Sequence, residues 1–262
     1  MRIGRISGFT TEHFALAKSQ KMRFIELCCN NAEDAARVID SEASIRDSIR
    51  TYGIDVSCVG RWNHELTSGG ALCRERLAQY EALMETAITL GAKTFVTGVN
   101  YDESISLYRN YTLAIDALGT LIEKSAGRIR VAVQNCHWNN FIDSPRQWDI
   151  LFSELPELYI KYDPSHAYKR GADYLAEMSD YGHKIAHMHI KGILKAGSTA
   201  VDDPPAGMDA IAWPSVFAIL YARGYRGDLS IEPHSKTWQG SLGDFGVRFT
   251  RDYIRPFVSD GE

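Results

Sequence analysis

Eight short runs of apolar residues, each followed by a longer segment of mixed polar and apolar character, constrain the fold of this chain most strongly. The runs are residues 2–8, 24–29, 54–60, 94–100, 130–136, 159–163, 185–191 and 228–233. Most are continuously apolar, as expected of parallel strands buried on both faces. Glycines such as Gly53, Gly91 and Gly127 stand where the intervening helices should end. Eight such units in 262 residues predict an α/β fold, a (β/α)8 TIM barrel spanning 1–262 as a single domain.

A doubly wound open sheet is the alternative arrangement of the same units. The first run, RIGRISGF, lacks the GxGxxG spacing of a nucleotide-binding loop, so the barrel is favoured. One connection, from Gly192 to Ala212, is long and rich in Gly, Ser, Asp and Pro, which predicts irregular structure. Because it follows the seventh run directly, we expect this loop to cover the site as a lid.

Composition excludes several classes of protein. The formal charge of −4 provides no general basic surface for nucleic acid. The five cysteines are an odd number without zinc-site spacing, which indicates reduced thiols. No apolar run approaches the roughly 18 residues of a membrane helix, and the N-terminus resembles no signal peptide. We therefore expect a cytoplasmic protein without membrane or nucleic-acid partners; a homo-oligomer or a partner subunit remains compatible with the sequence.

Four runs end on side chains that can bind a metal: Gln134, Asp163, His189 and Glu232. In a barrel the C-terminal ends of all strands meet at one rim, so these residues should converge. Two carboxylates, an imidazole and an amide favour Mn²⁺, Mg²⁺ or Co²⁺, with Zn²⁺ possible. His187 shares a face with His189, but His189 lies nearer the strand end. The alternative is a set of polar rim residues without a metal, with Gln134 serving only as a hydrogen-bonding residue.

The segments VAVQNCHW, KYDPSHAY, IAHMHIKG and LSIEPH, taken in order, resemble the xylose isomerase-like TIM barrel superfamily of sugar phosphate isomerases and epimerases. The resemblance covers nearly the whole chain. It implies that Asp163, His189 and Glu232 are metal ligands and that His166 binds substrate. It also implies a basic substrate contact after the His ligand, for which Lys195 is the nearest match and Lys191 a weaker one.

The chain departs from this family at Gln134, where a glutamate is usual. An amide can offer its oxygen to a metal, but it cannot accept a proton at neutral pH. Glu232 is then the single carboxylate base, and we expect His137 or His166 to handle the second proton. This pattern disfavours two-base epimerisation. It leaves aldose–ketose isomerisation through an enediol, or β-elimination from a keto-sugar or keto-glycoside.

Further candidates for substrate contact are aromatic and amide side chains near the strand ends. Trp62 and Trp138 can pack against the C–H face of a sugar, and Asn100 can bind a hydroxyl group. Tyr168 and Trp238 are further aromatic candidates, and Glu26 is a further candidate for the rim. No dense cluster of Arg and Lys is visible, which favours an unphosphorylated substrate.

The predicted function is that of a divalent-metal-dependent sugar isomerase or epimerase, with Mn²⁺ preferred. It acts by proton transfer next to the carbonyl of a sugar or keto-sugar, with Glu232 as both ligand and base. The alternatives are a lyase or dehydratase that performs β-elimination, a non-catalytic sugar-binding barrel subunit, and a metal-dependent endonuclease. The acidic composition argues against the endonuclease.

Overall fold

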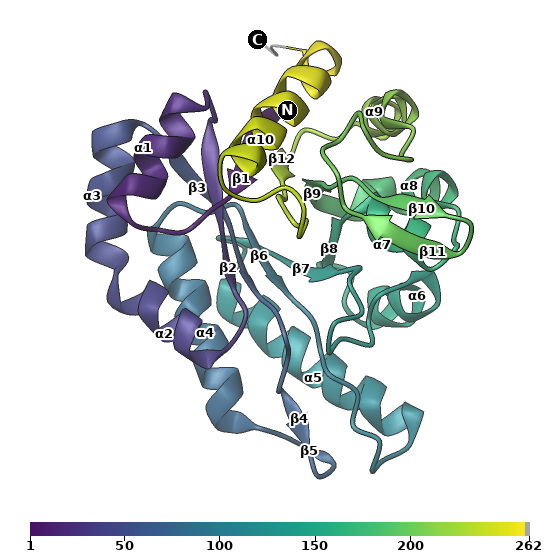
Figure 1. The fold of residues 1–262 in the computed structure, drawn as a ribbon. Coiled ribbons are helices and arrows are strands. Elements are labelled where there is room, and N and C mark those ends of the chain that lie inside the picture. Colours follow the sequence, from purple (N-terminus) through teal and green to yellow (C-terminus); the bar gives the residue numbers. More distant parts are fainter. Residues whose placement is uncertain (260–262) are drawn as a thin grey trace.

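The computed structural model describes residues 1–259, in which eight parallel strands close into one barrel (Figure 1). The barrel strands are β1 (Arg2–Ile6), β2 (Phe24–Cys29), β3 (Asp55–Arg61), β6 (Thr94–Thr97), β7 (Arg130–Gln134), β8 (Tyr159–Tyr162), β9 (Ile185–Ile190) and β12 (Asp228–Ile231). Pairing of β1 with β12 in parallel closes the ring. The predicted (β/α)8 fold is therefore confirmed.

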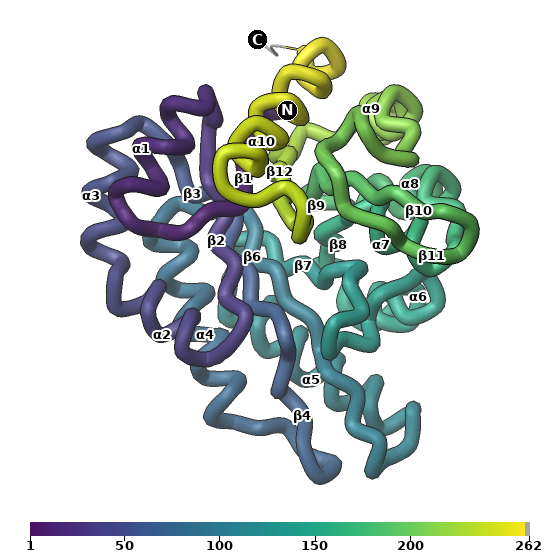
Figure 2. Tube along the Cα trace, viewed as in Figure 1, coloured from purple at the N-terminus to yellow at the C-terminus, as the bar shows by residue number. Residues whose placement is uncertain are grey.

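Helices surround the barrel, and the chain returns through them from the end of each strand to the start of the next (Figure 2). They are α1 (Thr11–Ser19), α2 (Ala32–Asp40), α3 (Glu42–Tyr52), α4 (Arg74–Thr89), α5 (Leu107–Ser125), α6 (Pro145–Glu154), α7 (Pro164–Lys169), α8 (Tyr174–Tyr181), α9 (Trp213–Ala222) and α10 (Gly240–Ile254). Short 3-10 turns follow α8 at Gly182–Lys184 and α10 at Arg255–Phe257. None of the helices among the described residues is both long and apolar enough to span a membrane.

Strand periodicity divides the core into two parts. Ile160 and Tyr162 of β8 belong to the large core between strands and helices, and the Tyr162 hydroxyl donates to Glu177 of α8 at 2.9 Å. The apolar cluster inside the barrel is small: Cys58, Trp62, Val96 and Ala132. Each fully buried Val, Ile or Leu of the outer core contributes about 1.5–3 kcal/mol. The fold is thus stabilised mainly outside the barrel, which leaves room for polar side chains inside it.

An ion-pair cluster joins the N-terminal ends of the first and last strands. Arg2 donates from Nε to Asp228 Oδ1 at 2.9 Å and from Nη2 to Asp228 Oδ2 at 2.6 Å. Ser57 also donates to Asp228, and Arg2 Nη1 reaches Asp55 of β3 at 2.5 Å. Because Arg2 and Asp228 lie 226 positions apart, this contact forms only when the barrel closes.

Two hairpins extend from the barrel: β4 (Thr67–Ser68) with β5 (Ala71–Leu72), and β10 (Leu194–Ala196) with β11 (Thr199–Asp202). The second hairpin corrects the prediction that 192–212 is irregular throughout. Gly197, with φ of 62°, allows a tight turn between its strands. The hairpin lies beside α7 (Figure 2), where Lys195 Nζ is 5.4 Å from the ring centroid of Tyr168.

Candidate active site

A cavity of about 510 Å³ opens among the C-terminal ends of the strands. Its lining includes the predicted residues Trp62, His137, Trp138, His166, His189 and Glu232. Lys161 and Lys191 also line it, together with Cys28 and Asp203. A concave site of this size suits a small ligand such as a sugar.

Asp163, His189 and Glu232 each offer one donor atom, and these atoms all lie within 4.8 Å of one another. Asp163 ends β8 and caps α7, because its Oδ1 accepts from the backbone N–H of Ser165 at 2.8 Å. Pro164 at the first helical position favours this turn from strand to helix. The other oxygen of Asp163, Oδ2, is buried without a hydrogen-bond partner among the described residues. One unbonded carboxylate oxygen beside an imidazole and a second carboxylate suits a divalent cation.

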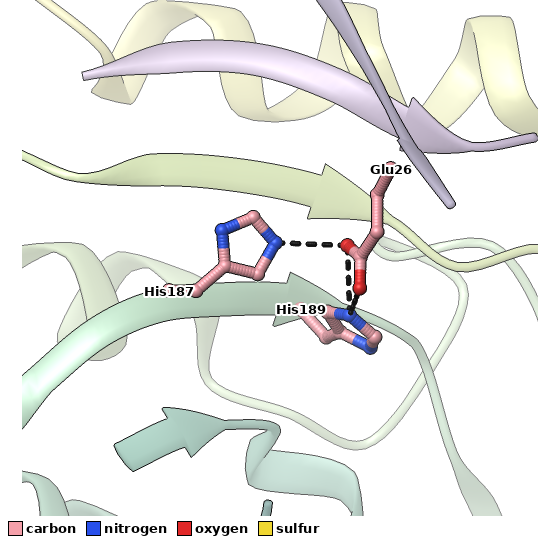
Figure 3. Close-up of side chains that lie close together, drawn as sticks. All are labelled: Glu26, His187 and His189. Carbon is pink, nitrogen blue, oxygen red and sulfur yellow. Dashed lines mark hydrogen bonds and ion pairs between the residues drawn. The ribbon is translucent and has the colours of Figure 1, made fainter. Parts of the chain in front are cut away.

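Glu26 holds the His189 ring in place (Figure 3). Its carboxylate oxygens lie 2.9 and 3.0 Å from His189 Nε2, and Oε2 lies 2.8 Å from His187 Nε2. Carboxylates face both ring nitrogens, since His189 Nδ1 lies 2.6 Å from Glu232 Oε2, so the ring donates from Nε2 to Glu26 and from Nδ1 to Glu232. Loss of the Nδ1 proton would free a lone pair on that nitrogen for a cation. Glu26 lies within β2 and is fully buried, so it supports the donor set from inside the barrel and is not part of the rim.

The local charges keep the site carboxylates ionised. Burial favours the neutral form of Glu232, but the Lys191 ammonium and the His189 hydrogen bond outweigh burial and hold its pKa well below the usual range. Burial likewise opposes ionisation of Asp163, but Lys191 and His166 outweigh it and lower the pKa to about 2. Burial favours neutral His189, but Glu26 and Glu232 outweigh it and raise the pKa of His189. Glu232 is therefore available as a base.

Lys191, rather than Lys195, is the basic residue that reaches the site. Its Nζ lies 3.3 Å from Asp163 Oδ2, 3.7 Å from Glu232 Oε1 and 3.3 Å from His166 Nε2. Lys195 is outside the cavity lining and contacts Tyr168 instead. The family resemblance made Lys195 the nearest match, but the hairpin turns that side chain toward α7.

Gln134 is fully buried and is also outside the cavity lining. Its Nε2 lies 3.0 Å from Nε2 of His64, whose Nδ1 lies 3.1 Å from the Tyr80 hydroxyl. Burial, and then Arg61, lower the pKa of His64 to about 3, so this ring is neutral and can accept from the Gln134 amide. Gln134 Oε1 has no partner among residues 1–259 and is the atom this side chain would offer to a cation.

The remaining predicted residues lie in different surroundings. Trp62 folds back over Gly60, where an added Cβ would lie 1.8 Å from the indole ring. Trp138 is 47% exposed at the mouth of the cavity. Asn100 is outside the lining: its amide donates to Thr67 O at 2.8 Å and accepts from Thr67 N at 3.0 Å. Asn100 therefore holds β4 through these two hydrogen bonds. The predicted contact between Asn100 and a substrate hydroxyl group is not supported by its position.

Lys161 is a site residue that the sequence reasoning missed. It lies in β8, two positions before Asp163, and the alternation of a strand puts both on the inner face. The available signal was a charged residue between Ile160 and Tyr162 in a buried strand. The ammonium groups of Lys161 and Lys191 therefore line the cavity together with the carboxylates.

The comparisons with known proteins agree with this fold. Solved structures of similar shape include 3-keto-D-glucoside 4-epimerase from E. coli (17% identity, 98% of this chain and 99% of that one, TM-score 0.75). D-Psicose 3-epimerase from Clostridium cellulolyticum H10, solved with D-tagatose, is 11% identical over 99% of this chain and 100% of that one, with a TM-score of 0.78. The IOLI protein with a bound zinc atom is 16% identical over 99% and 98%, with a TM-score of 0.76.

Sequence comparison gives the family directly. No curated protein matches the chain. The profile of the xylose isomerase-like TIM barrel family matches residues 14–253, which include the seven barrel strands from β2 to β12 and every donor named above. The chain belongs to the xylose isomerase-like TIM barrel family.

Proposed function

We propose that this protein is a sugar isomerase or epimerase-type enzyme that moves a proton on a carbon next to a carbonyl group. The observation that carries the proposal is the convergence of Asp163, His189 and Glu232 beside a cavity of sugar size. Structures that resemble this chain include epimerases of 3-keto-D-glucoside and of D-psicose, whose activities lend support to the same kind of chemistry here.

Asp163, His189 and Glu232 would hold a divalent cation, with Gln134 Oε1 as a further candidate donor. Mn²⁺ is the preferred ion, and Mg²⁺, Co²⁺ and Zn²⁺ are alternatives. When bound, such an ion polarises a substrate carbonyl and acidifies the neighbouring C–H. The IOLI protein, a barrel of similar shape whose structure holds a zinc atom, supports the binding of a metal by this chain.

Glu232 is the base in this proposal, because its carboxylate is ionised and only 16% exposed. His166, whose Nε2 lies 3.4 Å from Asp163 Oδ2, binds substrate and donates the second proton, to oxygen, while Glu232 keeps the proton taken from carbon; His137 is the alternative donor at the cavity wall. Trp62 and Trp138 contact the apolar face of the sugar and limit access of water to the reacting carbon.

The amide of Gln134 narrows the reaction type. It cannot accept a proton, and its Nε2 is bonded to His64. One carboxylate base suits transfer of a proton between adjacent carbons of an enediol. The same observation favours a second candidate, β-elimination from a keto-sugar, in which Glu232 removes the proton and a histidine protonates the leaving group.

The test is hydrogen exchange at carbon in D₂O with Mn²⁺-loaded protein and a panel of keto-sugars, followed by NMR. We expect solvent deuterium in a C–H next to the carbonyl, and at least about a 100-fold slower exchange in Glu232→Gln. Gln134→Glu is the matched control, because it should retain metal binding measured by elemental analysis. Undiminished exchange in Glu232→Gln contradicts its role as base. Bound metal without exchange on any sugar favours a binding protein.

A further inference from the structure

Lys161 carries a buried charge that the reaction proposed above does not use. Its side chain is 1% exposed, yet it lines the cavity. Among residues 1–259 its ammonium group has no hydrogen bond and no ion pair within 4 Å, although it acts on the carboxylates of Asp163 and Glu232 from a greater distance. An ammonium removed from bulk water without a partner is costly, so a counter-charge is expected in the cavity.

The strand pairing explains why Lys161 has no partner. Its neighbours across the sheet are Gln134 on β7 and His187 on β9. A carboxylate at position 134 would stand next to the ammonium on the same face of the barrel. The amide at this position is held by His64, and His187 is held by Glu26. Neither cross-strand neighbour therefore supplies a carboxylate in direct contact with the Lys161 ammonium.

The charges around the donor set do not compensate for Lys161 once a cation is bound. Three carboxylates, those of Glu26, Asp163 and Glu232, surround the site, and two of them already contact Lys191. Two ammonium groups and a divalent ion would exceed these three negative charges by one. An anionic ligand restores neutrality in this low-dielectric space.

The position of the charge selects the kind of anion. The His234 side chain is 68% exposed and is paired with Asp203 at 3.1 Å, whereas Lys161 is 1% exposed, so the charge of Lys161 lies deeper in the cavity. A carbonyl group must also lie deep in the cavity to be near Glu232, whose side chain is 16% exposed. An anionic group there is attached close to the reacting carbon, as a carboxylate is in a keto-sugar acid. A phosphate at the far end of a sugar would point toward the mouth.

We propose that Lys161 is a specificity-determining residue, and that the cavity binds a keto-sugar acid whose carboxylate pairs with the Lys161 ammonium. The inference rests on the proposed function for the place of the carbonyl and of the cation. It narrows the unphosphorylated substrate expected from the sequence to an acidic keto-sugar. It also accounts for the amide at position 134, which leaves the Lys161 ammonium available to the ligand.

Calorimetric binding to Mn²⁺-loaded protein at constant ionic strength tests this proposal with three probes: D-fructose, 2-keto-D-gluconate and D-fructose 6-phosphate. We expect 2-keto-D-gluconate to bind at least about tenfold more tightly than D-fructose, because charge-assisted hydrogen bonds to a buried ammonium are strong. Lys161→Met should abolish this preference and leave the affinity for D-fructose within about threefold of the original.

Two further variants sharpen the result. Lys169→Met removes another lysine of the cavity lining and should keep the preference for the acid. Gln134→Glu leaves Lys161 in place but supplies a neighbouring carboxylate, so it should weaken binding of the acid even if Lys161→Met fails to fold. The proposal is overturned if the original protein binds the acid and the neutral sugar equally or binds neither. It is also overturned if Lys161→Met or Gln134→Glu keeps the original preference for the acid. Tighter binding of D-fructose 6-phosphate than of 2-keto-D-gluconate would also overturn it, because the anion bound would then be a phosphate and not a carboxylate.

The outcome for Lys161 is separable from the outcome for catalysis. Deuterium exchange on neutral keto-sugars without a preference for acids retains the proposed function and rejects the role of Lys161. Selective binding of the acid without exchange on any probe retains the role of Lys161 and rejects the proposed chemistry.

Discussion

Lys191 shares its carboxylate partners with any cation that binds the site. Its Nζ lies 3.3 Å from Asp163 Oδ2, the same oxygen that has no hydrogen bond. Burial opposes charging of this amine, but Asp163 and Glu232 outweigh burial and raise the pKa of Lys191. The ammonium therefore repels a second cation and also stabilises the two carboxylates when no metal is bound.

Replacement of Lys191 by Met tests this competition. We expect Lys191→Met to bind Mn²⁺ about tenfold more tightly, because a like charge near the ion is removed. Without metal the variant should unfold at a lower temperature than the original protein, since Asp163 and Glu232 lose their counter-charge. Titration calorimetry and thermal unfolding with and without Mn²⁺ measure both effects. Unchanged Mn²⁺ affinity would show that Lys191 and the ion do not compete.

At the level of secondary-structure elements, one residue at the junction between β8 and α7 both caps the helix and belongs to the proposed metal site. Asp163 ends the strand, caps the helix through Oδ1 and presents Oδ2 to the donor set. The helix has only six residues, so it depends on this cap and on Pro164 more than a long helix would. The positions of His166 and of the metal donors are thereby linked.

A pair of substitutions separates the two tasks of Asp163. Asp163→Asn keeps an oxygen that can accept from Ser165 N–H, whereas Asp163→Ala removes both the cap and the donor. We expect both variants to bind Mn²⁺ at least about tenfold more weakly, and the alanine variant to be about 1 kcal/mol less stable than the asparagine variant. Equal stabilities in urea unfolding would contradict the capping role.

At the scale of the whole molecule, closure of the barrel brings Arg2 and Asp228 together at the end opposite the site. Burial disfavours the Asp228 carboxylate, but hydrogen bonds from Arg2 and Ser57 outweigh burial and lower its pKa. A lowered pKa in the folded state means that the stabilising contribution is present above the pKa of the unfolded chain. It is lost as the pH falls through the folded-state value.

Asp228→Asn should therefore destabilise the barrel in a pH-dependent way. We expect a loss of about 2–3 kcal/mol in the free energy of unfolding at pH 7, because Arg2 loses a buried carboxylate partner. The loss is smaller than for a fully buried pair because Arg2 is partly exposed. The difference from the original protein should shrink below about pH 4, where an ordinary Asp becomes protonated. Urea unfolding at several pH values measures it. A difference that stays constant down to pH 3 would contradict the assignment.

Local patterns in the sequence determined the elements of this protein and the ends of its strands. Continuous apolar runs bury both faces of a strand, and Asp163, His189 and Glu232 follow such runs, so the barrel and the residues at its rim could be predicted. The hairpin within 192–212 was missed because its turn depends on two residues, Gly197 and Ser198, inside a segment rich in turn formers.

Which side chains meet inside the barrel depends on the three-dimensional packing of the strands. Periodicity indicates the face on which a residue lies, but the stagger of neighbouring strands and the direction of each side chain set its partners. These bring Glu26 to His189, Gln134 to His64 and Asn100 to Thr67, over separations from 33 to 163 positions. They also leave the Lys161 ammonium without a hydrogen bond or close ion pair among residues 1–259. Such pairings depend on the whole closed ring, and no single segment carries them.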